Sequence, residues 1–310
     1  MTIIKRYQHN PILTKDDVPY PVATVHNAAV VKHQGQYIMI FRSHRHNGRS
    51  VLGKAVSQDG FEFKVDPKPF MLPAISGMFA EYEAYGIEDP RITFIDGEYL
   101  ITYSAYSQHG VRIALAKTRD FETIERVSLI TQADYRNVVI FPEKFNGLYA
   151  RLDRPHSEIS PWSMWISYSP DLTYWGESKL IMKPMQYHWD EMKIGPGAPP
   201  IKTKKGWLNI YHGVFPTMDG SVYRLGVALH DLKDPSKVIA VGDEWILQPE
   251  EIYELTGYVH NVVFTCGAVP EVDGTLKLYW GGADKVMCAG TARIDELVDM
   301  CLSKPRKAIP

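Results

Sequence analysis

Two adjacent carboxylates, Glu88 and Asp89, lie just ahead of Arg91 in the segment Gly-Ile-Glu-Asp-Pro-Arg at positions 86–91. The apolar run at 92–95 that follows is typical of a strand. A carboxylic acid at the mouth of a strand, beside a cation, is suited to donating a proton to a leaving group. An ordinary turn is the competing interpretation, because Asp-Pro favours turn initiation in any protein. The segment is therefore a candidate acid site whose assignment depends on the elements around it.

The composition excludes several classes of protein. The 310 residues are 45% hydrophobic and 23% charged, which is typical of a soluble globular chain. A net charge of -2 argues against nucleic-acid or membrane partners that are bound through bulk charge. Cys266, Cys288 and Cys301 are too few and too irregularly spaced for a disulfide framework or a zinc site. Together with an N-terminus that lacks an apolar signal stretch, they predict a cytoplasmic protein.

One sequence unit recurs five times. In each copy a polar residue and a glycine precede an aromatic or apolar run, and an aspartate in a second turn follows about 21 to 25 residues after the glycine. The glycines are Gly35, Gly97, Gly147, Gly206 and Gly274, and the aspartates are Asp59, Asp120, Asp171, Asp231 and Asp295. Each copy is predicted to contain a strand, the glycine turn, two further strands and the aspartate turn, often with a fourth strand such as 61–63 or 237–241.

Four short antiparallel strands repeated around an axis form the blades of a β-propeller. We therefore predict an all-β protein, a single-domain five-bladed β-propeller over residues 1–310. The approximate blades are 20–75, 86–130, 136–183, 193–245 and 258–300, and residues 294–302 are the best helix candidate. A β-sandwich with coincidental turns is the alternative, which the shared distance from glycine to aspartate disfavours.

Polar residues gather where these hairpins bring strand ends together. The start of the first strand and the end of the second lie at the same edge of an antiparallel hairpin. Carboxylates occupy these positions in copies two and five, and cations occupy them in copies three and four. This division predicts a split site that binds an anion on one side and a polyol on the other. The residues are His26, Asn27, Arg42, Glu88, Asp89, Ser104, Arg136, Asn137, Arg154, Lys193, His212, His260, Asn261 and Asp284.

Glycoside cleavage normally uses one carboxyl group as the acid and a second as the base or nucleophile. The predicted site has an acid in Asp89 but no equally clear base opposite it. It has Arg136, Arg154, Lys193 and His212 instead. Inorganic phosphate bound by these groups would already be ionised and would need no base. The residues therefore favour phosphorolysis.

Several motifs together make the chain resemble glycoside hydrolase family 130, the inverting β-mannoside phosphorylases and related β-mannosidases on five-bladed propellers. The resemblance covers most of the chain. The motifs are His-Asn-Ala-Ala-Val-Val at 26–31, Phe-Arg at 41–42, Glu-Asp-Pro-Arg at 88–91, Arg-Asn-Val at 136–138, Phe-Pro at 141–142, Arg-Pro at 154–155, Lys-Ile-Gly-Pro-Gly at 193–197, Tyr-His-Gly at 211–213 and Gly-Ala-Asp at 282–284.

The resemblance implies roles for individual residues. Asp89 would be the general acid, relaying its proton through the O3 hydroxyl of a mannose. The phosphate-binding positions would be Arg136, Arg154, Lys193, His212 and Tyr223. Those around the sugar would be Asn27, Arg42, Arg91 and Asp284, and we add Glu88 and Tyr106 as substrate-binding candidates. Glu88 directly before the acid favours the branch that includes β-1,2-mannobiose and β-1,2-oligomannan phosphorylases.

The expected reaction converts a β-mannoside, β-1,2-linked or β-1,4-linked, and phosphate into α-mannose 1-phosphate and a shortened sugar. Phosphate is the co-substrate, and we expect no metal or other cofactor, since the eleven histidines show no ligand spacing. Three alternatives stay open: a β-mannosidase of the same family, a non-catalytic sugar-binding propeller, and a mannosyltransferase that uses a nucleotide sugar. Homo-oligomer formation is also open.

Overall fold

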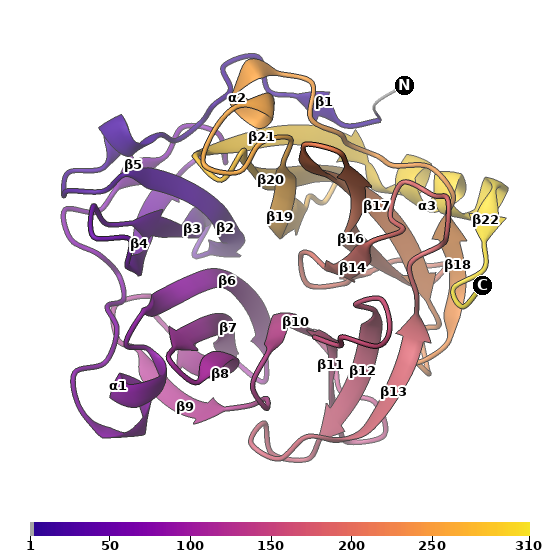
Figure 1. Cartoon of the computed structure of the whole chain (residues 1–310), viewed down its shortest axis with the longest axis horizontal. Coiled ribbons are helices and arrows are strands. Elements are labelled where there is room, and N and C mark those ends of the chain that lie inside the picture. Colours follow the sequence, from indigo (N-terminus) through magenta and orange to yellow (C-terminus); the bar gives the residue numbers. More distant parts are fainter. Residues whose placement is uncertain (1–2) are drawn as a thin grey trace.

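The computed structural model describes residues 3–310, so the first two residues of the N-terminal stretch lie outside the described part. Strands dominate, and they form separate sheets arranged around a common centre (Figure 1). The described helices are short: α1 (Gly77–Tyr82), α2 (Ile252–Leu255), α3 (Ile294–Ser303) and the 3-10 turn η1 (Lys15–Asp17). The helix predicted at 294–302 is confirmed as α3. None of the helices in the described residues combines the length and apolar character needed to cross a membrane.

The largest sheet contains two consecutive antiparallel meanders. They are joined by one parallel residue pair between β4 and β6, Ser50 opposite Gly86. The first meander consists of β2 (Thr24–His33), β3 (Gln36–His44), β4 (Ser50–Ser57) and β5 (Lys64–Val65). The second consists of β6 (Gly86–Ile95), β7 (Glu98–Ser107), β8 (Gly110–Thr118) and β9 (Glu125–Leu129).

The remaining strands form three further sheets. One consists of β10 (Tyr135–Ile140), β11 (Tyr149–Pro155), β12 (Met164–Ser169) and β13 (Gly176–Met182). The next consists of β14 (Lys193–Pro196), β15 (Ile201–Lys202), β16 (Trp207–Thr217), β17 (Gly220–His230), β18 (Val238–Gly242) and β22 (Pro305–Arg306). The last consists of β1 (Lys5–Arg6), β19 (Val263–Pro270), β20 (Thr275–Gly282) and β21 (Val286–Arg293).

Local turn chemistry accounts for the repeated hairpins. All five repeated glycines have a positive φ, from 80° at Gly97 to 151° at Gly206, which confirms the predicted glycine turns. In three of them the preceding residue is also left-handed: Gln34, Asp96 and Asn146. Two successive positive φ angles are the requirement of the type I′ hairpin turn.

The aspartate turns are confirmed in four copies. The side chain of Asp59 accepts backbone N–H groups of Phe61 and Glu62, and Asp120, Asp171 and Asp231 make the equivalent pairs of bonds. The fifth assignment is wrong, because Asp295 lies in the first turn of α3. The strand predicted at 61–63 is also wrong. Since the turn at Asp59 engages two of these N–H groups, the fourth strand begins later, as β5.

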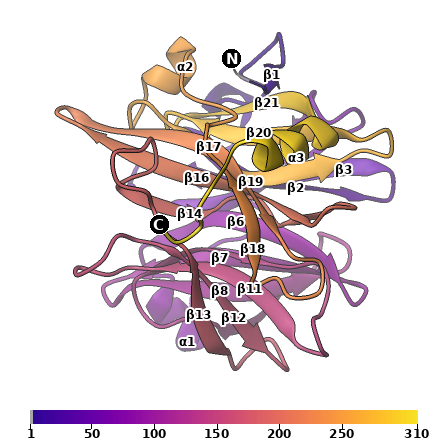
Figure 2. The same cartoon turned by 90° about the vertical axis from the view of Figure 1, so that its right-hand side faces the viewer.

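Buried side chains hold neighbouring sheets together. Phe141, Trp207 and Tyr211, for example, belong to an apolar cluster between the β10–β13 sheet and the sheet around β16. The helix α3 packs against β17, β18 and β21 (Figure 2). The chain thereby encloses its polar centre in packed sheets.

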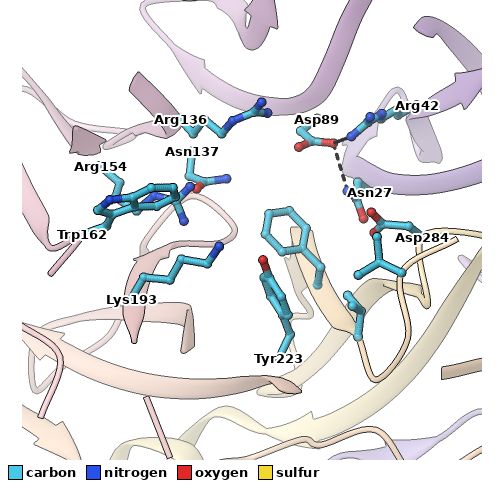
Figure 3. Close-up of a pocket in the computed structure, with 13 residues that line it drawn as sticks. Asn27, Arg42, Asp89, Arg136, Asn137, Arg154, Trp162, Lys193, Tyr223 and Asp284 are labelled. Atoms are coloured by element: carbon cyan, nitrogen blue, oxygen red, sulfur yellow. Dashed lines mark hydrogen bonds and ion pairs between the residues drawn. The ribbon is translucent and has the colours of Figure 1, made fainter. Parts of the chain in front are cut away.

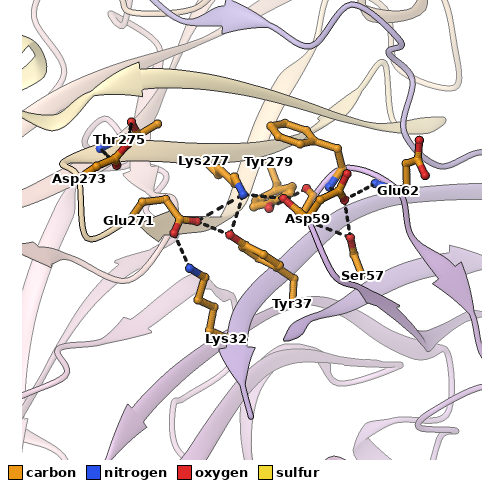
Figure 4. A network of polar contacts seen from close by, with 12 residues as sticks. Lys32, Tyr37, Ser57, Asp59, Glu62, Glu271, Asp273, Thr275, Lys277 and Tyr279 are labelled. Carbon is orange, nitrogen blue, oxygen red and sulfur yellow. Dashed lines mark hydrogen bonds and ion pairs between the residues drawn. The ribbon is translucent and has the colours of Figure 1, made fainter. Parts of the chain in front are cut away.

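A polar network joins the first and last sheets in sequence order (Figure 4). Glu271, next to β19, contacts Lys32 and Tyr37 of the first meander. Lys277 of β20 donates to the Tyr37 hydroxyl at 2.6 Å, and Tyr279 donates to the Gly60 carbonyl at 2.9 Å. These contacts place β2 and β19 side by side, so residues far apart in sequence face one centre.

Candidate active site

A bulge recurs in the first strand of three successive meanders. The register shifts between His26 and Ala29 in β2, between Glu88 and Arg91 in β6, and between Arg136 and Val139 in β10. Each bulge contains a left-handed residue: Asn27 (φ 51°), Asp89 (φ 50°) and Asn137 (φ 60°). Asn and Asp tolerate this conformation better than other non-glycine residues. Because a bulge redirects its side chain, these three residues face the centre although they lie inside strands rather than at their starts.

The bulges surround a cavity of about 320 Å³ (Figure 3). Nine of the predicted site residues line it: Asn27, Arg42, Asp89, Arg136, Asn137, Arg154, Lys193, Tyr223 and Asp284. Residues from four sheets are thus brought to one place.

Asp89 is held by neighbours from the first meander. Its Oδ1 accepts hydrogen bonds from Asn27 Nδ2 at 2.9 Å and from Arg42 Nη1 at 3.0 Å. The other carboxylate oxygen points away from these donors into the cavity (Figure 3). Asp89 is only 6% exposed. One oxygen is therefore used for positioning, and the other is directed toward whatever occupies the cavity.

Charge determines the protonation state of this group. Burial alone would raise the pKa of Asp89, but the charges of Arg42 and Arg91 and the hydrogen bond from Asn27 outweigh that effect. The pKa of Asp89 consequently lies well below its usual range. Asp89 is a carboxylate in the free protein at neutral pH.

Glu88 does not line the cavity. Its Oε1 accepts from Arg42 Nη2 at 2.8 Å and from the Ser50 hydroxyl at 3.1 Å, and its Oε2 lies 3.5 Å from Arg136 Nη1. It thus ties an arginine beside Asp89 to an arginine of the opposite wall. A direct role in binding substrate stays a prediction.

Arg91 also lies behind the cavity surface. Its Nε donates to the Gly197 carbonyl at 2.8 Å, and its Nη1 donates to the Asp89 carbonyl at 3.0 Å. The side chain is buried, with 2% of the residue exposed. Arg91 therefore connects the bulge that bears Asp89 to the segment following Lys193, and contact with a sugar stays a prediction.

The opposite wall is cationic. Arg136 and Arg154 stand directly across from one another on β10 and β11. Lys193 Nζ lies 4.9 Å from the ring centre of Trp162 and 5.3 Å from that of Tyr223. The guanidinium of Arg154 is 5.1 Å from the same Trp162 ring. The two carboxylates that line the cavity, Asp89 and Asp284, both lie on the Arg42 side (Figure 3).

Burial and repulsion between neighbouring positive charges lower the pKa values of Lys193 and Arg154. Burial, Arg154 and Arg136 lower the pKa of Lys193 to about 8. Burial also lowers the pKa of Arg154 to about 9; Tyr223 opposes this effect, and Arg136 and Arg91 add to it. A bound anion would relieve this repulsion, so the wall is built for negative charge.

His212 supports Arg154 from behind. Its Nε2 lies 3.1 Å from Arg154 Nη1, and the residue is fully buried. Burial and the charge of Arg154 keep the pKa of His212 well below its usual range. The ring is therefore neutral, and because Arg154 can only donate, Nε2 must accept. Direct binding of phosphate by His212 stays a prediction.

Burial raises the pKa of two further groups of the cavity. It raises the pKa of Asp284 to about 6, with Asp89 and Glu88 adding to the effect and Arg42 opposing it. It also raises the pKa of the Tyr223 hydroxyl, which stays protonated and can donate a hydrogen bond.

The aromatic residues that line the cavity differ in part from those predicted. Tyr106 lies outside the cavity lining and packs edge-on against Tyr85, with ring centres 5.5 Å apart, so its contact with a sugar stays a prediction. Trp162 and Phe264 line the cavity but were not predicted. Trp162 lies in an irregular loop outside the repeat pattern. Its neighbours Pro161 and Ser163 were the only local features of the sequence that indicated a loop at this position. In the described residues, no group of three or more His, Cys, Asp or Glu could hold a metal ion.

Several known proteins are similar to this chain over nearly its whole length. The model of glycoside hydrolase family 130, described as β-1,4-mannooligosaccharide phosphorylase, matches residues 3–303. A 1,2-β-oligomannan phosphorylase from Thermoanaerobacter sp. (strain X514) is 40% identical, over 93% of this chain and 96% of the relative. A β-1,4-mannooligosaccharide phosphorylase from Ruminococcus albus is 34% identical, over 96% and 90%. The structure of the Listeria innocua β-1,2-mannobiose phosphorylase with β-1,2-mannobiose superposes with a TM-score of 0.90 at 32% identity, over 97% of this chain and 99% of that one.

Proposed function

Because this chain belongs to glycoside hydrolase family 130, we propose that it is an inverting phosphorylase of β-mannosides. It cleaves the mannoside with inorganic phosphate and releases α-mannose 1-phosphate and a shortened sugar. Relatives with this activity in their names, including 1,2-β-oligomannan and β-1,4-mannooligosaccharide phosphorylases, support the proposal.

The division of the cavity is the observation that carries the proposal. An acid, Asp89, lies on one side, and a cationic wall without a carboxylate base lies on the other. A hydrolase needs a base there to activate water. Phosphate needs instead a set of donors and positive charges, which Arg136, Arg154 and Lys193 supply.

In the proposed reaction an oxygen of phosphate attacks the anomeric carbon on the face opposite the leaving oxygen. The bond to the leaving sugar breaks, and that oxygen takes a proton relayed from Asp89 through the mannose O3 hydroxyl. Asp89 must therefore gain a proton after substrates bind. A bound phosphate dianion brings negative charge into the same cavity and opposes Arg42 and Arg91, which raises the pKa of Asp89 toward a value suited to this task.

The remaining parts of the proposal are finer. The five meanders form the five blades of one propeller domain. The arrangement of the first strands β2, β6, β10, β14 and β19 nearest the centre supports this (Figure 1).

Glu88 before the acid and the 40% identity to a 1,2-β-oligomannan phosphorylase favour β-1,2-linked substrates. The protein is cytoplasmic, and phosphate is its only co-substrate; three buried free thiols are consistent with a reducing compartment.

The test supplies β-1,2-mannobiose and β-1,4-mannobiose with and without inorganic phosphate. Release of mannose 1-phosphate that requires phosphate is the expected result, with the β-1,2 substrate cleaved faster. If free mannose were released equally well without phosphate, the protein would be a hydrolase and not a phosphorylase. If the protein bound mannosides but cleaved none of them, it would be a non-catalytic sugar-binding protein.

A further inference from the structure

A second cavity, of about 210 Å³, adjoins the cationic wall. It shares Arg136, Arg154 and Trp162 with the first cavity and is otherwise lined by Val111, Asp134 and His156. Asp134 and His156 are exposed, whereas Val111 is buried. The second cavity therefore extends from solvent to the same two guanidinium groups that face the first one.

The two arginines have donors to spare. Their direct opposition across β10 and β11 places like charges together, which destabilises a strand pair unless an anion lies between them. Arg154 is 5% exposed, and its side-chain hydrogen bond is to the neutral His212 ring. Arg136 has one long ion pair, 3.5 Å to Glu88. Since a guanidinium carries five N–H donors, both groups can serve a ligand on either side.

The geometry of the proposed reaction distinguishes the two cavities. In an inverting displacement the nucleophile and the leaving group lie on opposite sides of the anomeric carbon. Asp89 marks the side of the leaving sugar, and the cations mark the side of phosphate (Figure 3). The second cavity is on the phosphate side, so a departing sugar does not need it. A mannoside seated in the first cavity would, however, obstruct phosphate arriving by the same mouth.

We propose that the second cavity is an entry site for inorganic phosphate, which Arg136 and Arg154 pass to the reaction centre while a mannoside occupies the first cavity. This inference rests on the proposed phosphorylase function. Trp162 lines both spaces together with these two arginines. The centre of its ring lies 4.4 Å from the centre of the His156 ring. The same ring centre lies 5.1 Å from the Arg154 guanidinium carbon and 4.9 Å from Lys193 Nζ. The Asp134 carboxylate at the rim lies beside Gly110 and tunes entry by repelling the anion.

The experiment obstructs the second cavity through residues that do not line the first. His156→Trp fills the exposed mouth, and Val111→Phe fills the buried end. Initial rates are measured over a grid of phosphate and β-1,2-mannobiose concentrations. We expect the phosphate KM to rise at least about fivefold while the mannobiose KM at saturating phosphate stays unchanged. We also expect excess mannobiose to become inhibitory, because phosphate must then enter through the mouth that the sugar occupies, and added phosphate should relieve this inhibition.

A complementary variant, Asp134→Asn, keeps a residue that tolerates the left-handed backbone at this position (φ 62°) and removes the charge at the rim. It should lower the phosphate KM about twofold, an effect that added salt diminishes. Asp219→Asn, at an exposed hairpin tip, is the matched control and should change nothing. Thermal unfolding of every variant separates misfolding from obstruction, and the conservative Asp134 variant keeps the test available if a bulky one fails to fold.

The outcomes separate this inference from the proposed function. A wild-type protein without phosphate-dependent cleavage would refute the function itself. An active wild type whose folded obstructed variants keep their phosphate KM and show no mannobiose inhibition would overturn the entry site. A higher KM for mannobiose, with phosphate unaffected, would also overturn it and assign the second cavity to the sugar.

Discussion

Arg42 joins Asp89 and Glu88 through one guanidinium group, with Nη1 3.0 Å from Oδ1 of Asp89 and Nη2 2.8 Å from Oε1 of Glu88. The two adjacent carboxylates thus have different surroundings. Both oxygens of Glu88 have partners among Arg42, Ser50 and Arg136, whereas Asp89 keeps one oxygen directed into the cavity. Of the pair, Asp89 alone is placed to exchange a proton with a bound sugar.

Replacing Asp89 by asparagine should reduce phosphorolysis by about 10³-fold or more, because the proton donor is lost while the left-handed backbone is kept. Steady-state rates with mannobiose and phosphate measure the effect. Asp96→Asn is the matched control, since Asp96 is also left-handed (φ 53°) but lies in a surface turn. If the Asp89 variant kept wild-type rates, its role as the acid would be refuted.

Removing the Arg154 side chain should raise the KM for phosphate about 10- to 100-fold, since hydrogen bonds to charged groups contribute about 1.5–3 kcal/mol. The KM for mannobiose should change little. Arg119→Ala removes a side chain that is 76% exposed and far from this role, and serves as the control. Equal losses for both substrates would instead indicate a structural role for Arg154.

Phosphate binding should weaken as the pH rises through about 8. The pKa of Lys193 is lowered to about 8, so its ammonium group is charged below that pH and neutral above it. The phosphate KM measured from pH 7 to 9.5 should therefore rise on the alkaline side. Lys193→Arg should move the rise to higher pH, because the ordinary pKa of arginine is higher than that of lysine. A flat profile in the wild type would contradict a charged lysine at the phosphate position.

A methyl group at Gly195 should impair the cationic wall. A Cβ there would lie 2.7 Å from His212 Cε1 and 3.1 Å from Asn137 Oδ1, too close for either to keep its place. Gly195→Ala should therefore displace the His212 ring that supports Arg154, raising the phosphate KM and lowering the melting temperature. At Gly176 the same substitution meets nothing within 4 Å, so Gly176→Ala should behave as the wild type. If Gly195→Ala and Gly176→Ala had the same phosphate KM and melting temperature, the cationic wall would tolerate a displaced His212 ring.

Local chemistry made much of the fold predictable. Glycines with positive φ and aspartates that accept nearby N–H groups act within a few residues, so the repeated turns could be found from the sequence. The exceptions have local causes too. The Asp59 turn engages the N–H groups needed by a strand at 61–63, and α3 takes over the position where a fifth aspartate turn was expected at Asp295.

The sequence by itself determined which residue types are available to the site, and the spacing of the repeats assigned most of them to one edge. Only the tertiary structure decided which of these side chains reach the cavity. The bulges turn Asn27, Asp89 and Asn137 inward, while Glu88, Arg91 and His212 lie behind the surface, and Trp162 enters from an irregular loop. The physical reason is that burial, ion pairing and bulge direction depend on partners from other sheets, which no local pattern encodes. For Gly-Ile-Glu-Asp-Pro-Arg, the sequence predicted Asp89 as the acid, and the structure shows Glu88 held by Arg42, Ser50 and Arg136 while one oxygen of Asp89 points into the cavity.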